Sequence, residues 1–314
     1  MSKSICINKH LYLLKLVDVK EVAVNRVEFG QLVTALRREQ RDESDKAWTQ
    51  KRLGKETGLG ELTIGKIERG QRTNLDEDSL LRLVNALQLT SLERKEFFLA
   101  AIGVNGKQVA REENDPAKIL DNLIQKIQEI QLPAYIIDVY GDVVAANISI
   151  IRLLELSNDY LTHSYSVPAG FNHIRIGFDP GSGFRQLLGG GWHPVAVHIM
   201  QLFRGVSLRY RFTKYFKYTL SGLRQYPLFR QYWQLAYSED FYWNCLHYTY
   251  NHRKFGHLNY LATPSQILTS SGELFLIIYC PVSPQTNDIF KDITEQVGTT
   301  VHRLASWPEK NLLE

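Results

Sequence analysis

Cysteine is scarce in this sequence and is not arranged for pairing. The 314 residues contain three cysteines, Cys6, Cys245 and Cys280, and no two of them have the C-x-x-C spacing of a zinc ribbon. The pattern therefore indicates neither a disulfide framework nor a cysteine zinc site. We expect reduced thiols, and a core supplied by the hydrophobic residues that make up 44% of the chain.

Long hydrophobic runs are also missing. The run LFLIIYC, which begins at Leu274, is far shorter than the roughly 20 residues that a membrane-spanning helix needs. The N-terminal segment HLYLLKLVDV is interrupted by Lys15 and Asp18 and has no small-residue cleavage site, so it does not resemble a signal peptide. We expect a cytoplasmic protein without stable membrane insertion.

Motifs of catalysis are absent in the same way. The triplet GSG at Gly181 is not a nucleophile elbow, and GGGW at Gly189 lacks the Lys and Ser/Thr of a phosphate-binding loop. His193 and His198 are five residues apart, which places them on different faces of a helix and argues against a metal pair. We predict no catalytic residue, no metal site and no cofactor, and we expect that the protein is not an enzyme.

The small net charge is unevenly distributed along the chain. The sequence has 37 basic and 33 acidic side chains. Residues 1–110 hold 19 basic and 15 acidic side chains (19 − 15 = +4), and the remainder holds 18 of each (18 − 18 = 0). This excess favours a phosphate-rich partner for the N-terminal half.

The segment 49–70, TQKRLGKETGLGELTIGKIERG, predicts two short helices around a glycine turn. Thr49 is a suitable N-cap for a helix over 50–56, and Gly58 stands where a left-handed residue must bend the chain. A second helix over 60–69 would face inward with Leu53, Leu59, Ile64 and Ile67, and outward with Glu61, Leu62, Gly65 and Lys66. Such a pair presents its outer face to the DNA major groove.

Three more helices are predicted around this pair. The first covers 28–39, with an apolar stripe at helical spacing. Another is capped by Asp76 or Asp78, and the last begins at Ser91 as N-cap and ends at Gly103. Residues 27–104 therefore predict an all-α domain of five helices.

These segments together resemble the DNA-binding domain of the XRE family, the λ-repressor-like helix-turn-helix regulators. The resemblance rests on FG at Phe29, TQxxLG at Thr49, the turn at Gly58, IxxIExG at Ile64 and LLxLVNAL at Leu80. It implies double-stranded DNA as a partner and a buried ion pair between Arg37 and Glu68.

The predicted DNA-binding residues lie on the helix pair and just beyond it: Gln50, Lys51, Glu61, Leu62, Thr63, Lys66, Arg69 and Arg72. The resemblance implies that Gln50 holds a phosphate. Lys66 can donate to guanine, Leu62 can pack on a thymine methyl group and Glu61 can accept from cytosine. The alternative is a bundle that has kept the fold and no longer binds DNA.

A second domain is predicted after a polar linker over 105–117. Residues 118–131 have one apolar face, which either packs on this domain or forms a dimer helix. A hairpin over 133–147 is followed by a helix, and further helices are predicted over 194–204, 212–223 and 227–236. Strands are predicted over 241–250, 256–262 and 273–282, the last in a central position, and a helix over 287–305 closes the sheet or joins two protomers.

This half resembles the MmyB-like ligand-binding domain, a PAS-like module joined to XRE helix-turn-helices. The resemblance rests on PAYxxDxxGDVxAAN from Pro133, NHIRIGFDP from Asn172, Trp192, FRxxW from Phe229, and the closing block with GHLNY and GELFLIIYxP. The expected fold is multidomain: an arm over 1–26, the all-α helix-turn-helix domain over 27–104, an α+β PAS-like domain with an antiparallel sheet over 118–285, and a C-terminal helix or tail over 286–314.

A space between the sheet and its helices would be lined by apolar side chains. The predicted ligand-binding residues are Phe203, Phe216, Phe229, Trp233, Tyr242, Leu246, Tyr248, Leu258, Tyr260, Leu276 and Ile278. A fatty-acid-like molecule is the hypothesis, with its carboxylate held by Arg209, Arg211, Lys214 or Arg224. The alternative for the aromatic set is a dry core.

We therefore expect a transcription regulator that binds a palindromic operator as a homodimer and responds to a small apolar ligand. Two other interpretations stay open. The second domain could be a protein-interaction or dimerisation module without a ligand, and the helix-turn-helix could be structural or antitoxin-like.

Overall fold

The computed structural model describes residues 26–72, 75–103, 115–236, 246–269, 271–310 and 312. The arm predicted over 1–26 and the linker predicted over 105–117 fall almost entirely outside these residues. Tyr242 and the first part of the strand predicted over 241–250 also lie outside them. None of the described helices is both long and apolar enough to cross a membrane.

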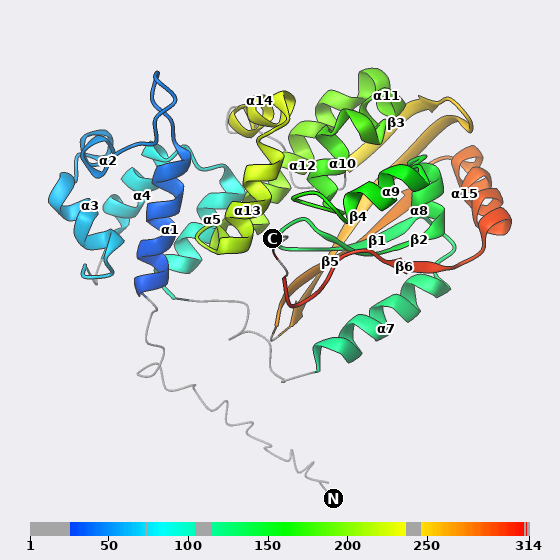
Figure 1. Ribbon diagram of the computed structural model, residues 1–314, viewed down its shortest axis with the longest axis horizontal. Helices are drawn as coiled ribbons and strands as arrows, with labels where there is room; N and C mark the ends of the chain where they lie inside the picture. The colour runs from blue at the N-terminus through cyan, green and yellow to red at the C-terminus, as the bar shows by residue number, and fades with distance from the viewer. Residues whose placement is uncertain are drawn as a thin grey trace, which may run out of the picture.

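The N-terminal part is a bundle of five helices (Figure 1). The helices are α1 (Arg26–Glu39), α2 (Gln50–Thr57), α3 (Glu61–Glu68), α4 (Glu77–Ala86) and α5 (Ser91–Ala101). Their core is formed by one stripe from each helix and includes Leu32, Leu53, Ile64, Leu83 and Phe97. The five predicted helices are thus present, in the predicted order.

Side-chain caps and left-handed residues set the ends of these helices. Thr49 accepts a hydrogen bond from the Arg52 amide at the start of α2, and Gly58 ends α2 with a φ of 67°. Thr90, and not the predicted Ser91, caps α5, because its hydroxyl accepts from the Glu93 amide while the Glu93 carboxylate accepts from the Thr90 amide. This reciprocal arrangement is a capping box, which Ser91 cannot form because Arg94, and not Glu or Gln, stands three residues after it.

Two glycines allow the helices to approach each other closely. A Cβ at Gly30 on α1 would lie 2.4 Å from the carbonyl oxygen of Glu68, and a Cβ at Gly54 on α2 would lie 2.7 Å from the amide nitrogen of Glu61. Both neighbours are backbone atoms and cannot rotate away. The position of α3 therefore depends on the absence of side chains at 30 and 54.

The C-terminal part is built on one six-stranded antiparallel sheet with the order β3-β4-β5-β1-β2-β6. The strands are β1 (Ala134–Asp138), β2 (Val143–Asn147), β3 (Leu246–His252), β4 (Gly256–Thr269), β5 (Gly272–Pro281) and β6 (Val301–Arg303). The hairpin β1–β2 and the central position of β5 are as predicted. The fold is multidomain, a helical domain followed by a domain of helices and antiparallel sheet.

Helices cover both faces of the sheet (Figure 1). On one face, α7 (Pro116–Glu129) packs Leu123 and Ile127 against Ile136 and Val144. The prediction that this apolar face packs on the following domain is therefore confirmed. The other face carries α8 (Ile148–Leu153), α9 (Asn158–Ser164), α10 (His173–Phe178), α11 (Phe184–Leu188) and α12 (Trp192–Val206).

The remaining elements extend this second layer. They are α13 (Lys214–Leu223), α14 (Pro227–Leu235) and α15 (Pro284–Val297), with short 3-10 turns η1 (Pro180–Ser182), η2 (Gly189–Gly191) and η3 (Leu208–Tyr210). In Figure 1, α13 lies between the N-terminal bundle and the sheet. The helix predicted over 287–305 ends earlier, because Gly298 takes a φ of 77°, and 301–303 instead form β6 on the edge of β2.

Candidate functional site

The helix α3, which is predicted to face DNA, is fixed to the bundle through its last residue. The Glu68 carboxylate accepts two hydrogen bonds from Arg37 on α1, at 2.6 Å from Nε and 3.0 Å from Nη2. Gln50 at the start of α2 donates to the same carboxylate at 2.7 Å. Only 8% of the Arg37 side chain and 5% of the Glu68 side chain are exposed. Because a buried charge that loses its partner is strongly destabilising, this pair holds α3 against α1 and α2.

The outer face of α3 is open to solvent around its first turn. Leu62 is 83% exposed, and Glu61 and Lys66 are exposed as well. Gly65, which was expected on this face, is buried, and a Cβ there would lie 3.1 Å from a guanidinium nitrogen of Arg69. Without a side chain at 65, Arg69 can lie across the helix. The accessible side chains are therefore those at 61, 62 and 66.

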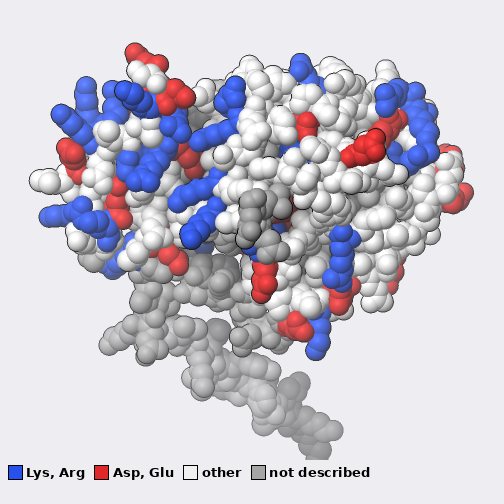
Figure 2. Space-filling model, viewed as in Figure 1, with Lys and Arg blue, Asp and Glu red and all other residues white. Residues whose placement is uncertain are grey.

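The other residues predicted to contact DNA lie on the same helix pair or just after it. Lys51 and Arg69 are exposed, and Gln50, Thr63 and Arg72 are half-buried. Figure 2 shows that Lys and Arg side chains gather over the helical bundle and along its boundary with the sheet domain. On the face in view, the rest of the sheet domain carries both basic and acidic side chains. This distribution agrees with the excess of basic residues in the N-terminal half and favours a surface for a polyanion.

A buried network of charges joins the two domains. Glu93 on α5 is fully buried, and its carboxylate accepts two hydrogen bonds from Arg204 on α12, both at 3.0 Å. The same carboxylate bonds the guanidinium of Arg211, which follows η3. Arg211 also donates to Glu39 at the end of α1, at 2.8 Å. Burial raises the pKa of the Glu93 carboxyl, but the charges of Arg204 and Arg211 outweigh this effect and hold it at about 2.

The two domains also share apolar packing. Leu208, in η3, is fully buried in the core of the helical bundle, and Phe212 packs against the same core. On α12, Gly205 lies so close to α5 that a Cβ there would be 1.8 Å from a methyl carbon of Leu92. The C-terminal domain thus completes the core of the helical bundle through Leu208, and α12 packs on α5 as well as in its own domain.

Within the C-terminal domain, a small apolar cavity of about 30 Å³ lies between the sheet and the helices that follow it. It is lined by Tyr135, Val143, Ala146, Ile150, Ile151, Leu154, Leu156, Phe171, His173, Ile176, Phe184, Tyr279 and Leu304. Its polar lining residues are Tyr135, His173 and Tyr279, and the Tyr135 hydroxyl lies 3.4 Å from the His173 Nε2. Burial lowers the pKa of His173 to about 4, so the imidazole is neutral at physiological pH.

The predicted ligand-binding residues do not gather around this cavity. The side chains of Phe203, Phe216, Phe229, Trp233, Leu246, Tyr248, Leu258 and Tyr260 are buried in the main core. Leu276 and Ile278 pack on the opposite face of the sheet, against the cluster that contains α7. Phe216, Phe229 and Trp233 also line hollows at the boundary between the domains.

The basic residues predicted to hold a carboxylate have other places. Arg209 pairs with Glu96 at 2.8 Å, and Arg211 belongs to the buried network. Lys214 is exposed, and Arg224 lies at the boundary between the domains.

The role of Glu93 in joining the two domains was not predicted from the sequence, although the pattern T-x-x-E from Thr90 is the sequence signal of a capping box.

A second buried cluster was also missed. Lys310, near the C-terminus, inserts its ammonium group between Asp138 and Asp142 of the β1–β2 hairpin. It lies 5.3 Å from the ring centre of Tyr215, whose hydroxyl donates to Asp142 at 2.6 Å. Burial raises the pKa of Asp138 to about 6 despite the opposing charge of Lys310. Among the described residues, no group of histidine, cysteine and carboxylate side chains is arranged to hold a metal ion.

Comparison with protein families assigns both halves of the chain. No curated protein matches the sequence significantly. A helix-turn-helix family matches residues 38–94, which contain α2, α3 and Glu68 and begin directly after Arg37. The MmyB-like transcription regulator ligand binding domain matches residues 119–292, which contain α12 and most of the sheet. This second match covers more than half of the 314 residues, and the chain belongs to the family of MmyB-like transcription regulators.

Proposed function

We propose that this DNA-binding transcription regulator is a cytoplasmic homodimer whose C-terminal domain senses an apolar small molecule, with a fatty acid as the first candidate. The observation that carries the proposal is the path from the apolar cavity to α3. The helices that cover the cavity pack on α12, and α12 holds α5 through Arg204 and Gly205. A ligand that moves α12 therefore acts on the bundle that positions α3.

The cavity must enlarge to hold such a ligand. A volume of about 30 Å³ holds little more than one methyl group or water molecule. Leu154, Leu156 and Leu304 line it from chain segments just beyond α8 and β6, so they are the side chains most easily displaced. The Tyr135–His173 pair would meet the carboxyl group of a bound acid, and the apolar wall would meet its chain.

The dimer follows from the reach of one recognition helix. Eight residues in α3, with three accessible side chains at 61, 62 and 66, contact too few base pairs for useful specificity. Two copies on a palindromic site would double the contacts. This part of the proposal is tested by the spacing of half-sites in selected DNA, which should be about 10 base pairs or a multiple of it.

The proposal is tested by selecting bound DNA from a random pool, with and without a lipid extract, and by native mass spectrometry of the purified chain. We expect enrichment of a palindromic sequence, a shift of its affinity when lipid is present, and a bound acid in the mass spectrum. If no sequence is enriched, the chain does not act as a sequence-specific regulator. If DNA is selected but no lipid binds and none changes the affinity, the ligand assignment is wrong.

Replacing Tyr135 with Phe should weaken binding of palmitate about three- to tenfold, because the substitution removes a hydroxyl that would meet the acid. DNA affinity without ligand should not change.

His173 has a pKa near 4, and a bound carboxylate beside it would stabilise the protonated imidazole and raise this pKa. Binding of the acid therefore takes up a proton. Palmitate affinity of the unsubstituted protein should therefore fall as the pH rises from 5 to 8. Calorimetry at several pH values measures both effects, and a pH-independent affinity that is equal in the two proteins contradicts this placement.

Replacing Lys66 with Ala should reduce discrimination among DNA sequences by about 1–3 kcal/mol, since Lys66 is exposed on α3 and can donate to base edges. Replacing Arg72 with Ala should weaken all sequences alike and lower the salt slope by about one unit, as expected for a phosphate contact. Competition binding at two or more salt concentrations separates the effects. Equal losses on every sequence for both variants would show that Lys66 does not read bases.

A further inference from the structure

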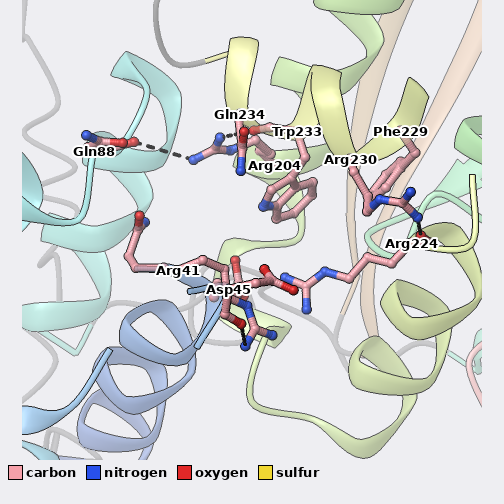
Figure 3. A pocket seen from close by; sticks show the side chains of 11 residues that line it. Arg41, Asp45, Gln88, Arg204, Arg224, Phe229, Arg230, Trp233 and Gln234 are labelled. Carbon is pink, nitrogen blue, oxygen red and sulfur yellow. Dashed lines mark hydrogen bonds between the residues drawn. The ribbon is translucent and has the colours of Figure 1, made fainter. Parts of the chain in front are cut away.

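Two adjoining hollows lie along the boundary between the two domains. The larger has a volume of about 600 Å³ and lies between α1 and α13, and the smaller, of about 340 Å³, reaches α14. Glu39, Arg41 and Arg224 line both, so the hollows adjoin, and we name the two together the boundary groove. Figure 3 shows its smaller end, where Arg41 and Asp45 of the loop after α1 lie across from Arg224 and Arg230. Each volume falls within the range of small-molecule sites.

The boundary groove is lined by cations that lack carboxylate partners. Within the described ranges, no ion pair to a carboxylate is formed by any of its five outer cations, Arg38, Arg41, Lys217, Arg224 and Arg230. Arg41 and Arg230 donate to backbone carbonyls instead. Of its two acids, Glu39 is already bonded to Arg211 at 2.8 Å, which leaves Asp45. Figure 2 shows a line of basic side chains along this boundary.

Arg224 is the cation with most to gain from an anion. It is half-buried, and its surroundings lower the pKa of the guanidinium, chiefly through burial. The charges of Glu39 and Asp45 offset part of this effect, but neither carboxylate forms an ion pair with Arg224. A charge that is partly removed from water gains from an anion beside it, which makes charge-assisted hydrogen bonds. Lys217 of α13 lies about two turns before Arg224 and is exposed at the same groove. The two side chains supply positive charge from the sheet domain, opposite Arg38 on α1.

The floor of the larger part is apolar. It is formed by Ala35 of α1 and by Phe212, Phe216 and Leu220 of the sheet domain. A fully hydrated ion such as phosphate gains nothing from this floor, whereas a molecule with an apolar body does. Charge at the rim and apolar surface below it together select for an amphipathic anion.

We propose that the boundary groove binds a small amphipathic organic anion, with its carboxylate or phosphate at Arg224 and Lys217 and its apolar body on Phe212 and Leu220. The occupant contacts α1 of the DNA-binding domain and α13 of the sheet domain at once, so it acts as a second effector beside the ligand of the apolar cavity. The proposal depends on neither the identity of that ligand nor the operator.

The test uses 8-anilino-1-naphthalenesulfonate, a fluorescent aromatic sulfonate, with the full chain at low salt. The double variant Lys217→Gln, Arg224→Gln should raise its Kd about tenfold, which corresponds to roughly 1.4 kcal/mol. A matched double variant, Lys118→Gln, Lys126→Gln, removes the same charge from exposed positions on α7 and should leave the Kd unchanged. If the groove variant fails to fold, Arg38→Gln, Arg230→Gln carries the same test, because both side chains are exposed.

Competition then distinguishes the two acid groups. Displacement of the dye by laurate assigns a carboxylate, and displacement by phenyl phosphate assigns a phosphate ester; either result supports the proposal. Displacement by neither, or an unchanged Kd in the groove variants, overturns it. A groove variant that keeps dye affinity but binds a DNA duplex of about 30 base pairs more weakly would assign the groove to DNA instead and would likewise overturn it.

Discussion

Replacing Glu93 with Gln is expected to lower the free energy of unfolding by about 3–5 kcal/mol at pH 7. The carboxylate is fully buried and holds Arg204 and Arg211 at the junction of the domains. Glutamine keeps the size of the side chain but removes the charge, so two buried guanidinium groups lose their counterion, and Glu39 compensates one of them only in part. Urea unfolding measures the loss. A change below about 1 kcal/mol would mean that the cost of removing these charges from water already cancels the attraction between them.

The difference in free energy of unfolding between the original protein and Glu93→Gln should depend on pH, and the direction follows from the pKa shift of Glu93. The pKa of Glu93 is held at about 2, below its ordinary value near 4.5. A carboxyl whose pKa is lower in the folded protein than in the unfolded chain stabilises the fold fully when the pH is above the unfolded-chain pKa. This stabilisation is lost as the pH falls through the folded-state pKa. The gap between the original protein and Glu93→Gln should therefore be constant above pH 5 and should close between about pH 4.5 and 2.

Glu96 provides the control for Glu93. It makes a similar ion pair across the same boundary, with Arg209 at 2.8 Å, but 22% of its side chain and 16% of that of Arg209 are exposed. Solvent screens such a pair, so Glu96→Gln should cost less than about 1 kcal/mol. A large loss in both variants would indicate that any change at this boundary is disruptive, and burial would no longer explain the effect at Glu93.

Local patterns in the sequence were enough to predict the DNA-binding domain. Its helices have short-range signals, such as the hydroxyl of Thr49 before α2 and the glycine at 58 after it, and its shape is completed by a pair, Arg37 and Glu68, implied by a family resemblance. The same kind of signal gave the β1–β2 hairpin and the central strand β5. At Thr90 and Ser91 the T-x-x-E pattern favours Thr90 as the cap, and the reciprocal bonds with Glu93 bear this out.

The junction between the domains could not be predicted from local pattern. Arg204 and Glu93 are 111 residues apart, and Arg211 and Glu39 are 172 apart. Nothing in the periodicity of either segment marks these partners. The residues that line the apolar cavity could not be picked out for a related reason: an aromatic side chain shows the same alternation whether it lies in the packed core, as Tyr260 does, or beside a space, as Phe171 does. Which side chains leave room is settled only when distant helices pack.

Replacing Gly205 with Ala is expected to separate α12 from α5 and to cost about 1–3 kcal/mol, the usual range for overpacking. Alanine would otherwise favour the helix by up to about 1 kcal/mol over glycine, so a loss has the opposite sign to the intrinsic effect. The cause is steric, since the new Cβ would lie 1.8 Å from a methyl carbon of Leu92. Gly190→Ala is the control, because a Cβ at that position would meet nothing within 4 Å.

Leu92→Ala should rescue Gly205→Ala, because it removes the atoms that the new methyl group strikes. In a double-mutant cycle measured by urea unfolding, the two changes together should cost about 1–3 kcal/mol less than the sum of their separate costs. Additive costs would show that α12 and α5 adjust independently. DNA affinity should be kept in Gly205→Ala, since Arg37 and Glu68 are untouched, while the response of DNA binding to ligand should be lost and then regained with Leu92→Ala. Because the same contact is broken and remade by changes that touch neither α3 nor the residues lining the apolar cavity, recovery of the response would assign the coupling to the junction of α5 and α12.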